Sequence, residues 1–143
     1  MKIDNNSHKF IYYKLVVNWG DCDPAGIVFY PNFYKWFDES HWFYFKELGI
    51  PIPELKIKYG IIGLPLVDTG AKFLIPCKQG QKLKVKTSIE SITNKTFTFK
   101  HEILLGHNVA VNGYEIRIWA SKDSSGKLIT SKIPSEILKV IKT

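Results

Sequence analysis

The residues best suited to chemistry in this sequence lie in one Gly- and Pro-rich segment, residues 19–32. Within it, Asp23 stands a few residues before Pro31, and proline suits the first turn of a helix, where its missing N–H costs nothing. Backbone N–H groups at a helix start attract developing negative charge. A carboxylate beside such donors is the minimum equipment for attacking an activated carbonyl, or for helping water to attack it. On the residues alone, a turn aspartate that caps nearby N–H groups is the commoner interpretation.

Residues 20–32 read Gly-Asp-Cys-Asp-Pro-Ala-Gly-Ile-Val-Phe-Tyr-Pro-Asn. This run resembles the active-site signature of the 4-hydroxybenzoyl-CoA thioesterase family, whose members are hotdog-fold acyl-CoA hydrolases. The resemblance continues into Tyr34, Trp36 and Asp38. In the Asp-x-Asp-Pro-Ala-Gly part of the signature, the second aspartate is the family's catalytic carboxylate, and it corresponds to Asp23. Asp21 matches the first aspartate, for which we expect a structural role in holding the loop.

The resemblance also implies the other parts of a mechanism. The backbone N–H of Tyr30, at the start of the helix, polarises the thioester carbonyl. Asp23 then either attacks the carbonyl to form a mixed anhydride or acts as general base for water, and the sequence leaves both routes open. A thioester has a good leaving group, so a nucleophile and help for the carbonyl oxygen suffice. Cys22 is the rival nucleophile, but it has no histidine partner nearby in sequence, so we expect a small buried residue instead.

Four further residues are expected to contact the substrate. The family position that corresponds to Asp38 contacts the phenolic hydroxyl in hydroxybenzoyl-specific members, across the dimer interface. A carboxylate on an otherwise apolar helix must be solvated or paired, so substrate contact and a structural role stay equally open for Asp38. For Trp36, an acyl pocket competes with plain core packing. Lys95 and Thr96 match residues of a family stretch that binds the CoA nucleotide, although the two preceding residues replace arginines, and a surface turn is the alternative.

Size and charge limit the class of protein. The 143 residues, 45% hydrophobic and 14% aromatic, suffice for one domain, residues 1–143, with a sizeable core, and they exclude a disordered chain. The net charge of +7 comes from lysine, since Arg117 is the only arginine. A ligand that carries phosphates, such as coenzyme A, is compatible with this charge, whereas no nucleic-acid-binding motif is evident.

Targeting and metal-binding signals are also lacking in the sequence. Residues 1–9 are polar and no stretch is apolar for long enough to span a bilayer, so we expect no membrane association and a cytoplasmic location. Two cysteines and four scattered histidines form no ligand motif. We therefore expect no metal, and no cofactor apart from the coenzyme A of the substrate.

The periodicity of apolar residues predicts an α+β chain. A helix is expected over residues 31–48, where aromatic residues cover most of the circumference and indicate a helix buried on nearly all sides. Residues 51–63 are expected to be irregular, and a short helix is expected from Ser135. Strands are expected over residues 11–18, 64–75 with a break near Gly70, 82–92, 96–105, 108–120 and 127–131. Consecutive strands with short turns form an antiparallel sheet, and one helix covers its apolar face. By resemblance, this outline is the hotdog fold, a curved sheet wrapped around a central helix.

The leading interpretation is an acyl-CoA thioesterase that hydrolyses a small aromatic acyl-CoA. The resemblance implies a site between subunits, and hence a homo-oligomer, either a dimer or a dimer of dimers. A short-chain aliphatic acyl-CoA thioesterase and a non-catalytic acyl-CoA- or protein-binding module are the alternatives. A hydratase or dehydratase of the same fold usually depends on a histidine paired with an acid, and no histidine lies within the signature.

Overall fold

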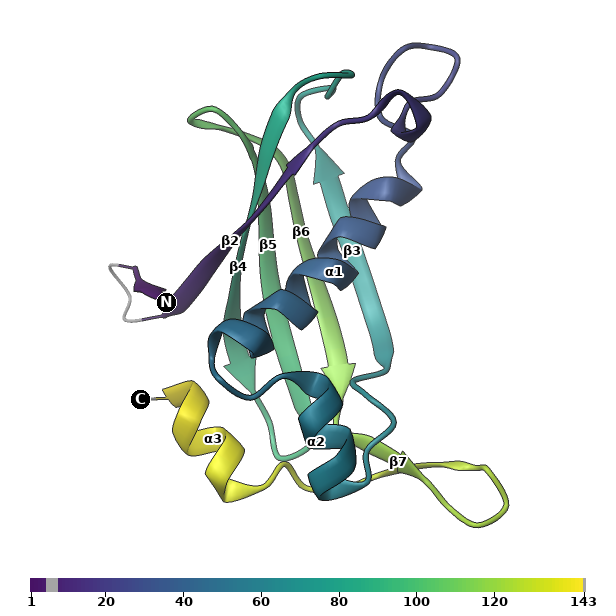
Figure 1. Cartoon of the computed structure of the whole chain (residues 1–143), viewed down its shortest axis with the longest axis vertical. Helices are drawn as coiled ribbons and strands as arrows, with labels where there is room; N and C mark the ends of the chain where they lie inside the picture. The colour runs from purple at the N-terminus through teal and green to yellow at the C-terminus, as the bar shows by residue number, and fades with distance from the viewer. Residues whose placement is uncertain (5–7, 143) are drawn as a thin grey trace.

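Six strands form one antiparallel sheet, and a long helix crosses one face of it (Figure 1). The structure, a computed structural model, describes residues 1–4 and 8–142; residues 5–7 and 143, part of the predicted single domain, lie outside the described residues. In order across the sheet, the strands are β1 (Lys2–Ile3), β2 (Lys9–Val16), β4 (Lys82–Ile92), β5 (Thr96–Leu105), β6 (Asn108–Ile118) and β3 (Leu66–Phe73). The predicted α+β class is confirmed.

The central strands follow the predicted alternation. β4 and β5 occupy residues 82–92 and 96–105, as expected. In β4, the lysines at even positions face solvent, whereas Leu83 and Val85 are buried against the helix side, because only one face of the sheet is covered.

The last predicted long strand is shorter than expected. β6 ends at Ile118, and the next residues form β7 (Ala120–Lys122), which pairs with β8 (Leu128–Thr130) in a separate hairpin. The break falls at Trp119, which is buried and whose N–H donates to Lys95 O at 2.8 Å. The strand predicted over residues 108–120 is thus divided at Trp119 into β6 and β7.

The long helix α1 (Pro31–Glu47) begins at a proline, as predicted. Its sheet-facing side buries the aromatic side chains of Phe33, Trp36, Phe37, Tyr44 and Phe45. The expectation of burial on nearly all sides is wrong for the single chain, since Trp42 is 40% exposed and Asp38 is also exposed. One sheet covers only one side of a helix, so the other side of α1 stays open.

The stretch predicted to be irregular contains a second helix, α2 (Ile52–Tyr59). Pro53 lies in its first turn, where no N–H is needed, and Glu54 follows it. Gly60 ends the helix with φ 70°, a left-handed conformation that glycine adopts without strain. The third helix, α3 (Ser135–Lys142), begins where predicted. None of the helices within the described ranges is long and apolar enough to cross a membrane.

Gly70 does not break β3. The strand is continuous from residue 66 to 73, and its irregularity lies between Leu66 and Asp68. A Cβ atom at Gly70 would lie 2.8 Å from Cε1 of Tyr114 on the neighbouring strand. The glycine therefore makes room for a tyrosine ring that crosses the strand.

Candidate active site

The loop between β2 and α1 is held together by Asp21. Its Oδ2 accepts a hydrogen bond from the Asn18 N–H at 2.8 Å, which closes the short 3₁₀ turn η1 (Trp19–Asp21). Its backbone carbonyl accepts from the Asn32 side chain at 2.8 Å and from the Phe29 N–H at 2.8 Å. Asp21 thus ties the loop to the first turn of α1, which is the structural role expected from the sequence.

Asp23 uses one of its two carboxylate oxygens inside the turn. Oδ1 accepts from the Ala25 N–H at 2.9 Å, and the Asp23 N–H donates to Ile27 O at 2.9 Å. Gly26, with φ 79°, supplies the left-handed residue that this tight turn requires. Within the described part of the chain, Oδ2 accepts no hydrogen bond. The half-buried side chain therefore caps the turn with one oxygen and keeps the other available.

Tyr30 occupies the N-cap position of α1. Its backbone N–H donates no hydrogen bond to any residue that the structure describes, as is typical of the first donors of a helix. The side chain is 59% exposed and contacts Phe29 and Phe73, with ring centroids 5.5 and 6.4 Å away. A free N–H at a helix start is a suitable place for the oxygen of a polarised carbonyl.

An open cavity of ≈ 570 Å³ lies beside the Asp23 loop. Its lining consists of Trp19, Gly20, Cys22, Asp23, Pro24, Gly26 and Gln79. Tyr30 is not part of this lining, so the two groups expected to carry the chemistry do not share one cavity in the single chain. Cys22 is half-buried and lines this open cavity, so the expectation of a buried residue is wrong. Its thiol contacts Asn18 O at 3.8 Å, and no histidine lines the cavity.

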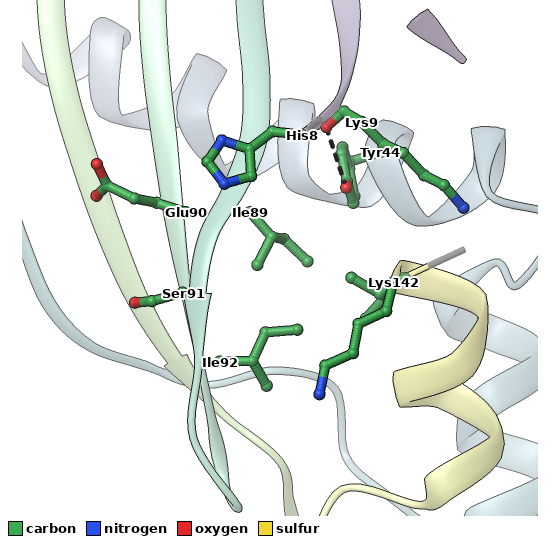
Figure 2. A pocket seen from close by; sticks show the side chains of 9 residues that line it. His8, Lys9, Tyr44, Ile89, Glu90, Ser91, Ile92 and Lys142 are labelled. Carbon is green, nitrogen blue, oxygen red and sulfur yellow. Dashed lines mark hydrogen bonds between the residues drawn. The ribbon is translucent and has the colours of Figure 1, made fainter. Parts of the chain in front are cut away.

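A smaller cavity of ≈ 280 Å³ lies at the other end of α1, between β4, the start of β2 and α3 (Figure 2). Figure 2 shows Ile89 and Ile92 pointing into it and Glu90 pointing away. Tyr44 lines this cavity, and its hydroxyl donates to Lys9 O at 3.3 Å. None of the predicted site residues lines it, so it adds nothing to the candidate active site.

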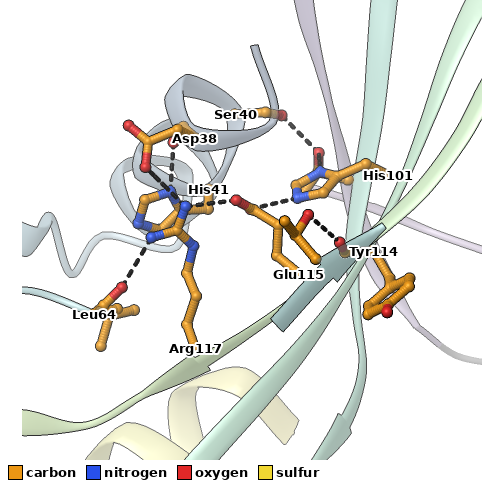
Figure 3. Close-up of polar contacts among 10 residues, drawn as sticks. Asp38, Ser40, His41, Leu64, His101, Tyr114, Glu115 and Arg117 are labelled. Atoms are coloured by element: carbon orange, nitrogen blue, oxygen red, sulfur yellow. Dashed lines mark hydrogen bonds and ion pairs between the residues drawn. The ribbon is translucent and has the colours of Figure 1, made fainter. Parts of the chain in front are cut away.

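Asp38 is paired, as a carboxylate on an apolar helix must be. Its Oδ1 accepts from Arg117 Nη2 at 2.7 Å, and its side chain is 54% exposed (Figure 3). Arg117, on β6, is buried, and its Nη1 donates to Leu64 O at 2.8 Å. The structural partner expected as one alternative for Asp38 is therefore present, while half of the carboxylate still faces outward.

Behind Arg117 lies a buried polar network that sequence reasoning missed. Arg117 Nη2 also donates to Glu115 Oε2 at 2.5 Å, and Glu115 Oε1 lies 2.7 Å from His101 Nε2. His101 and Glu115 do form a histidine–acid pair, but they are 0% and 2% exposed and lie under α1, out of reach of a substrate. A signal was present in the sequence: His101 takes an inward position in the alternation of β5, and Glu115 and Arg117 share the inward face of β6.

Burial and hydrogen bonding together set the protonation of this network. His41, a buried residue of α1, joins the network through a hydrogen bond between its Nδ1 and Asp38 O. Burial and then the Arg117 charge lower the pKa of His41 to about 3, and burial lowers the pKa of His101. Burial alone raises the pKa of Glu115, but the hydrogen bonds from His101 and Arg117 outweigh it and hold the pKa below its usual value. Both histidines are therefore neutral and Glu115 is ionised at neutral pH.

The remaining predicted residues lie apart from Asp23. Trp36 is 5% exposed and packs edge-on against Phe33 at 5.5 Å, inside the core. Lys95 lies in the turn between β4 and β5, and Thr96 is the first residue of β5, at the end of the sheet opposite the Asp23 loop (Figure 1). Lys95 is exposed, and the Thr96 hydroxyl lies 2.6 Å from that of Thr93. The single chain does not bring these residues to the loop, because α1 is about 25 Å long.

A family model of the thioesterase-like superfamily matches residues 17–141, which is most of the chain. The chain belongs to the thioesterase-like superfamily. This thioesterase-like chain is 30% identical to the 4-hydroxybenzoyl-CoA thioesterase of Pseudomonas sp. (strain CBS-3) over 130 residues, 87% of the chain and 92% of that protein. It is also 30% identical to the 1,4-dihydroxy-2-naphthoyl-CoA hydrolase of Prochlorococcus marinus (strain MIT 9515) over 136 residues, 92% of the chain and 89% of that protein.

Solved structures agree with the family. A variant of 4-hydroxybenzoyl CoA thioesterase complexed with 4-hydroxybenzoyl CoA superposes with a TM-score of 0.87 at 28% identity, covering 92% of this chain and 98% of that one. A gentisyl-coenzyme A thioesterase gives a TM-score of 0.80 at 38% identity, covering 90% and 99%. The predicted hotdog fold and family resemblance are confirmed, and this thioesterase-like chain is a thioester hydrolase.

Proposed function

We propose that this thioester hydrolase cleaves a small aromatic acyl-CoA to the free acid and coenzyme A, with Asp23 as the catalytic carboxylate. The proposal rests on two groups of the loop that lack hydrogen-bond partners in the described chain, Asp23 Oδ2 and the Tyr30 N–H. The substrate class is supported by relatives that are named for 4-hydroxybenzoyl-CoA, 1,4-dihydroxy-2-naphthoyl-CoA and gentisyl-coenzyme A.

Either of two routes gives the same products. In the nucleophilic route, Asp23 Oδ2 bonds to the thioester carbon, the C–S bond breaks and coenzyme A leaves as a thiolate; water then cleaves the mixed anhydride and restores the carboxylate. In the general-base route, Asp23 takes a proton from water as the oxygen of that water attacks the carbonyl, and the proton passes to the leaving thiolate. In both routes the Tyr30 N–H stabilises the carbonyl oxygen as its charge develops. Neither route needs a cofactor or a metal.

The edge of the sheet supports a homo-oligomer. β3 is an outer strand, and an unpaired strand edge is a template for pairing with another chain. Its Leu66, Val67 and Phe73 are 45%, 54% and 47% exposed, and Trp42 on the open side of α1 is 40% exposed. Apolar surface of this kind favours a partner subunit. We therefore propose a dimer or a dimer of dimers in which the acyl pocket is completed between subunits.

A second subunit also accounts for the remaining substrate contacts. Trp36, Asp38, Lys95 and Thr96 stay proposed substrate-binding residues. In one chain, Lys95 lies at the end of the sheet opposite Asp23, so we propose that the CoA nucleotide held at Lys95 and Thr96 belongs to a substrate whose thioester reaches the Asp23 loop of the other subunit. Asp38, with one oxygen facing outward, is proposed to accept a hydrogen bond from a ring hydroxyl.

A panel of acyl-CoA thioesters tests this function. The purified protein is assayed with hydroxylated aromatic, plain aromatic and short aliphatic acyl-CoAs, and the released thiol is detected with a chromogenic reagent. We expect kcat/KM to be highest for a hydroxylated aromatic acyl-CoA, by about tenfold or more over a short aliphatic one, the usual value of a few pocket contacts. A preference for aliphatic chains would favour the aliphatic thioesterase. Binding of acyl-CoA without hydrolysis of any panel member would identify a non-catalytic module.

A further inference from the structure

The exposed carboxylate of Asp38 is the outer end of the buried network of Figure 3. Only Oδ1 of Asp38 meets Arg117; within the described residues, Oδ2 has no hydrogen-bond partner. Asp38 is 54% exposed while Arg117 is 6% exposed. A half-exposed acid is thus anchored by a cation that has almost no freedom to move.

We propose that Arg117 is a positioning residue, which holds the Asp38 carboxylate by one oxygen and so presents the other oxygen in one fixed direction to a polar group on the acyl ring. The inference rests on the proposed function, in which Asp38 accepts a hydrogen bond from a ring hydroxyl. Arg117 itself touches no substrate in this account, since it lies beneath α1.

The guanidinium is fixed on three sides. Nη1 donates to Leu64 O at 2.8 Å, and Nη2 donates both to Glu115 Oε2 at 2.5 Å and to Asp38 Oδ1 at 2.7 Å. The planar fork of arginine makes such contacts in one geometry, whereas the point charge of lysine does not. Asp38 therefore accepts a hydrogen bond from a guanidinium group whose position is fixed by Leu64 and Glu115.

The network continues past Glu115 and returns to the helix that carries Asp38. Because His101 is neutral and Glu115 is ionised, the single ring proton of His101 is on Nε2 and points to Glu115. His101 Nδ1 then accepts from the Thr87 hydroxyl at 2.7 Å, which accepts in turn from the Ser40 hydroxyl at 2.6 Å. Every bond in this chain has one donor and one acceptor.

This series of hydrogen bonds connects α1 to the sheet at two points. It starts at Asp38 and ends at Ser40, two residues along the same helix, after crossing β6, β5 and β4. The His101 ring stacks parallel to the rings of Phe37 and Phe99, with ring centroids 4.7 and 6.0 Å apart, and these contacts restrict its rotation. These contacts fix both the position and the rotation of α1 at Asp38. The Asp38 carboxylate can therefore hold a substrate group in a precise position.

The competing explanation is that the network only stabilises the fold. Two substrates that differ only in one hydroxyl group distinguish this explanation from the positioning role. The measured quantity is the ratio of kcat/KM for 4-hydroxybenzoyl-CoA to kcat/KM for benzoyl-CoA. If Arg117 acts through Asp38, Arg117→Lys lowers this ratio by about tenfold, the value of one hydrogen bond to a charged group. Asp38→Asn lowers the ratio as much, and the double variant lowers it no further, since both changes remove the same contact. Glu136→Gln, which changes an exposed carboxylate on α3 paired with Lys58 at 3.2 Å, is the control and leaves the ratio unchanged.

Asp38→Glu keeps the test valid should Arg117→Lys fail to fold, because it changes an exposed side chain and keeps the charge. With Arg117 fixed, the longer side chain carries its second oxygen out of line, so the ratio falls as in Asp38→Asn. A ratio retained in Asp38→Glu, or an equal loss on both substrates in Arg117→Lys, would overturn the positioning role. An unchanged ratio in Asp38→Asn would overturn it too, while leaving aromatic acyl-CoA hydrolysis by Asp23 intact. Failure of the unaltered protein to hydrolyse either thioester would overturn the proposed function and the positioning role with it.

Discussion

The ring of Phe37 on α1 lies directly against the backbone of Gly113 on β6, where a Cβ atom would come within 2.5 Å of Phe37 Cε2. Phe37 is 0% exposed and stacks on the His101 ring. The missing side chain at Gly113 thus sets how closely α1 approaches the sheet. This approach also brings Asp38, the next residue of the helix, to its 2.7 Å contact with Arg117.

Gly113→Ala should therefore destabilise the fold. Because the buried Phe37 ring has no space to move into, we expect the free energy of unfolding to fall by about 1–3 kcal/mol, the usual cost of overpacking. Urea unfolding followed by tryptophan fluorescence measures it. Gly70→Ala is the matched control: its Cβ meets the ring of Tyr114, which is 37% exposed and held by one exposed hydrogen bond to Asp68, so the ring can shift outward and the loss should stay near about 0.5 kcal/mol. Equal losses in the two variants would contradict this account of the Phe37 contact.

The buried histidines should make the fold sensitive to acid. The pKa of His41 is lowered to about 3 by burial and by the Arg117 charge, and burial also lowers the pKa of His101. Below pH 6.5 the unfolded chain binds protons on these rings and the folded chain does not. Their contribution is therefore fully present above that pH and is lost as the pH falls toward the folded pKa, by up to about 1.4 kcal/mol per pH unit for each histidine.

Urea unfolding between about pH 4.5 and pH 8 measures this slope. His41→Gln should flatten it, since the amide does not titrate. The corresponding change at His107, an exposed residue in the turn between β5 and β6, should leave the slope as it is. Stability that rises on acidification would show that the network is not held in its neutral-histidine form.

Lys95 should affect binding and not turnover. If it meets a phosphate of coenzyme A, Lys95→Ala raises KM several-fold and leaves kcat nearly unchanged, because an exposed contact binds substrate and transition state alike. Added salt should shrink the difference from the unaltered protein. Lys127→Ala removes the same charge from another exposed turn and serves as control. Equal KM values in all three proteins would show that Lys95 is a solvated surface residue that does not bind coenzyme A.

The protein should be at least a dimer in dilute buffer. The exposed apolar side chains of β3 and of Trp42 are expected to be covered by a second copy, since an edge strand offers its backbone groups for pairing. Light scattering should give a mass of at least twice the 16.5 kDa of one chain. A single-chain mass across a wide range of concentrations would contradict the proposal that two subunits share the active site.

The elements predicted well from the sequence are those with a local signal. The alternation of β4 and the proline at the start of α1 place these elements correctly. α2 was missed because its eight residues bury only Ile52 and Leu55, too few for a visible pattern, although Pro53 and Gly60 mark its ends. The open side of α1, which contains Trp42, differs from the predicted burial for another reason: aromatic content shows how much apolar surface a helix carries, but not which chain covers it.

In the candidate site, too, the features with a local signal are predictable from the sequence and those that depend on distant residues are not. The turn around Asp23 follows from neighbouring residues, so the sequence predicts both its shape and its capping hydrogen bond. The pairing of Asp38 with Arg117 joins residues 79 positions apart and depends on β6 passing beneath α1. A strand pattern gives the inward face of Arg117 but not the helix residue above it, so this partner became visible only in the folded chain.

Asp23→Asn shows whether Asp23 is the catalytic carboxylate. The amide keeps the shape of the side chain and its hydrogen bond from the Ala25 N–H, but it neither attacks a carbonyl nor takes a proton from water. Steady-state kinetics on the best substrate of the panel should show kcat lowered by a factor on the order of 10² to 10⁴, with KM little changed. Asp21→Asn should instead lower thermal stability more than kcat, because Asp21 holds the loop. A near-normal kcat in Asp23→Asn would show that Asp23 is not the catalytic carboxylate.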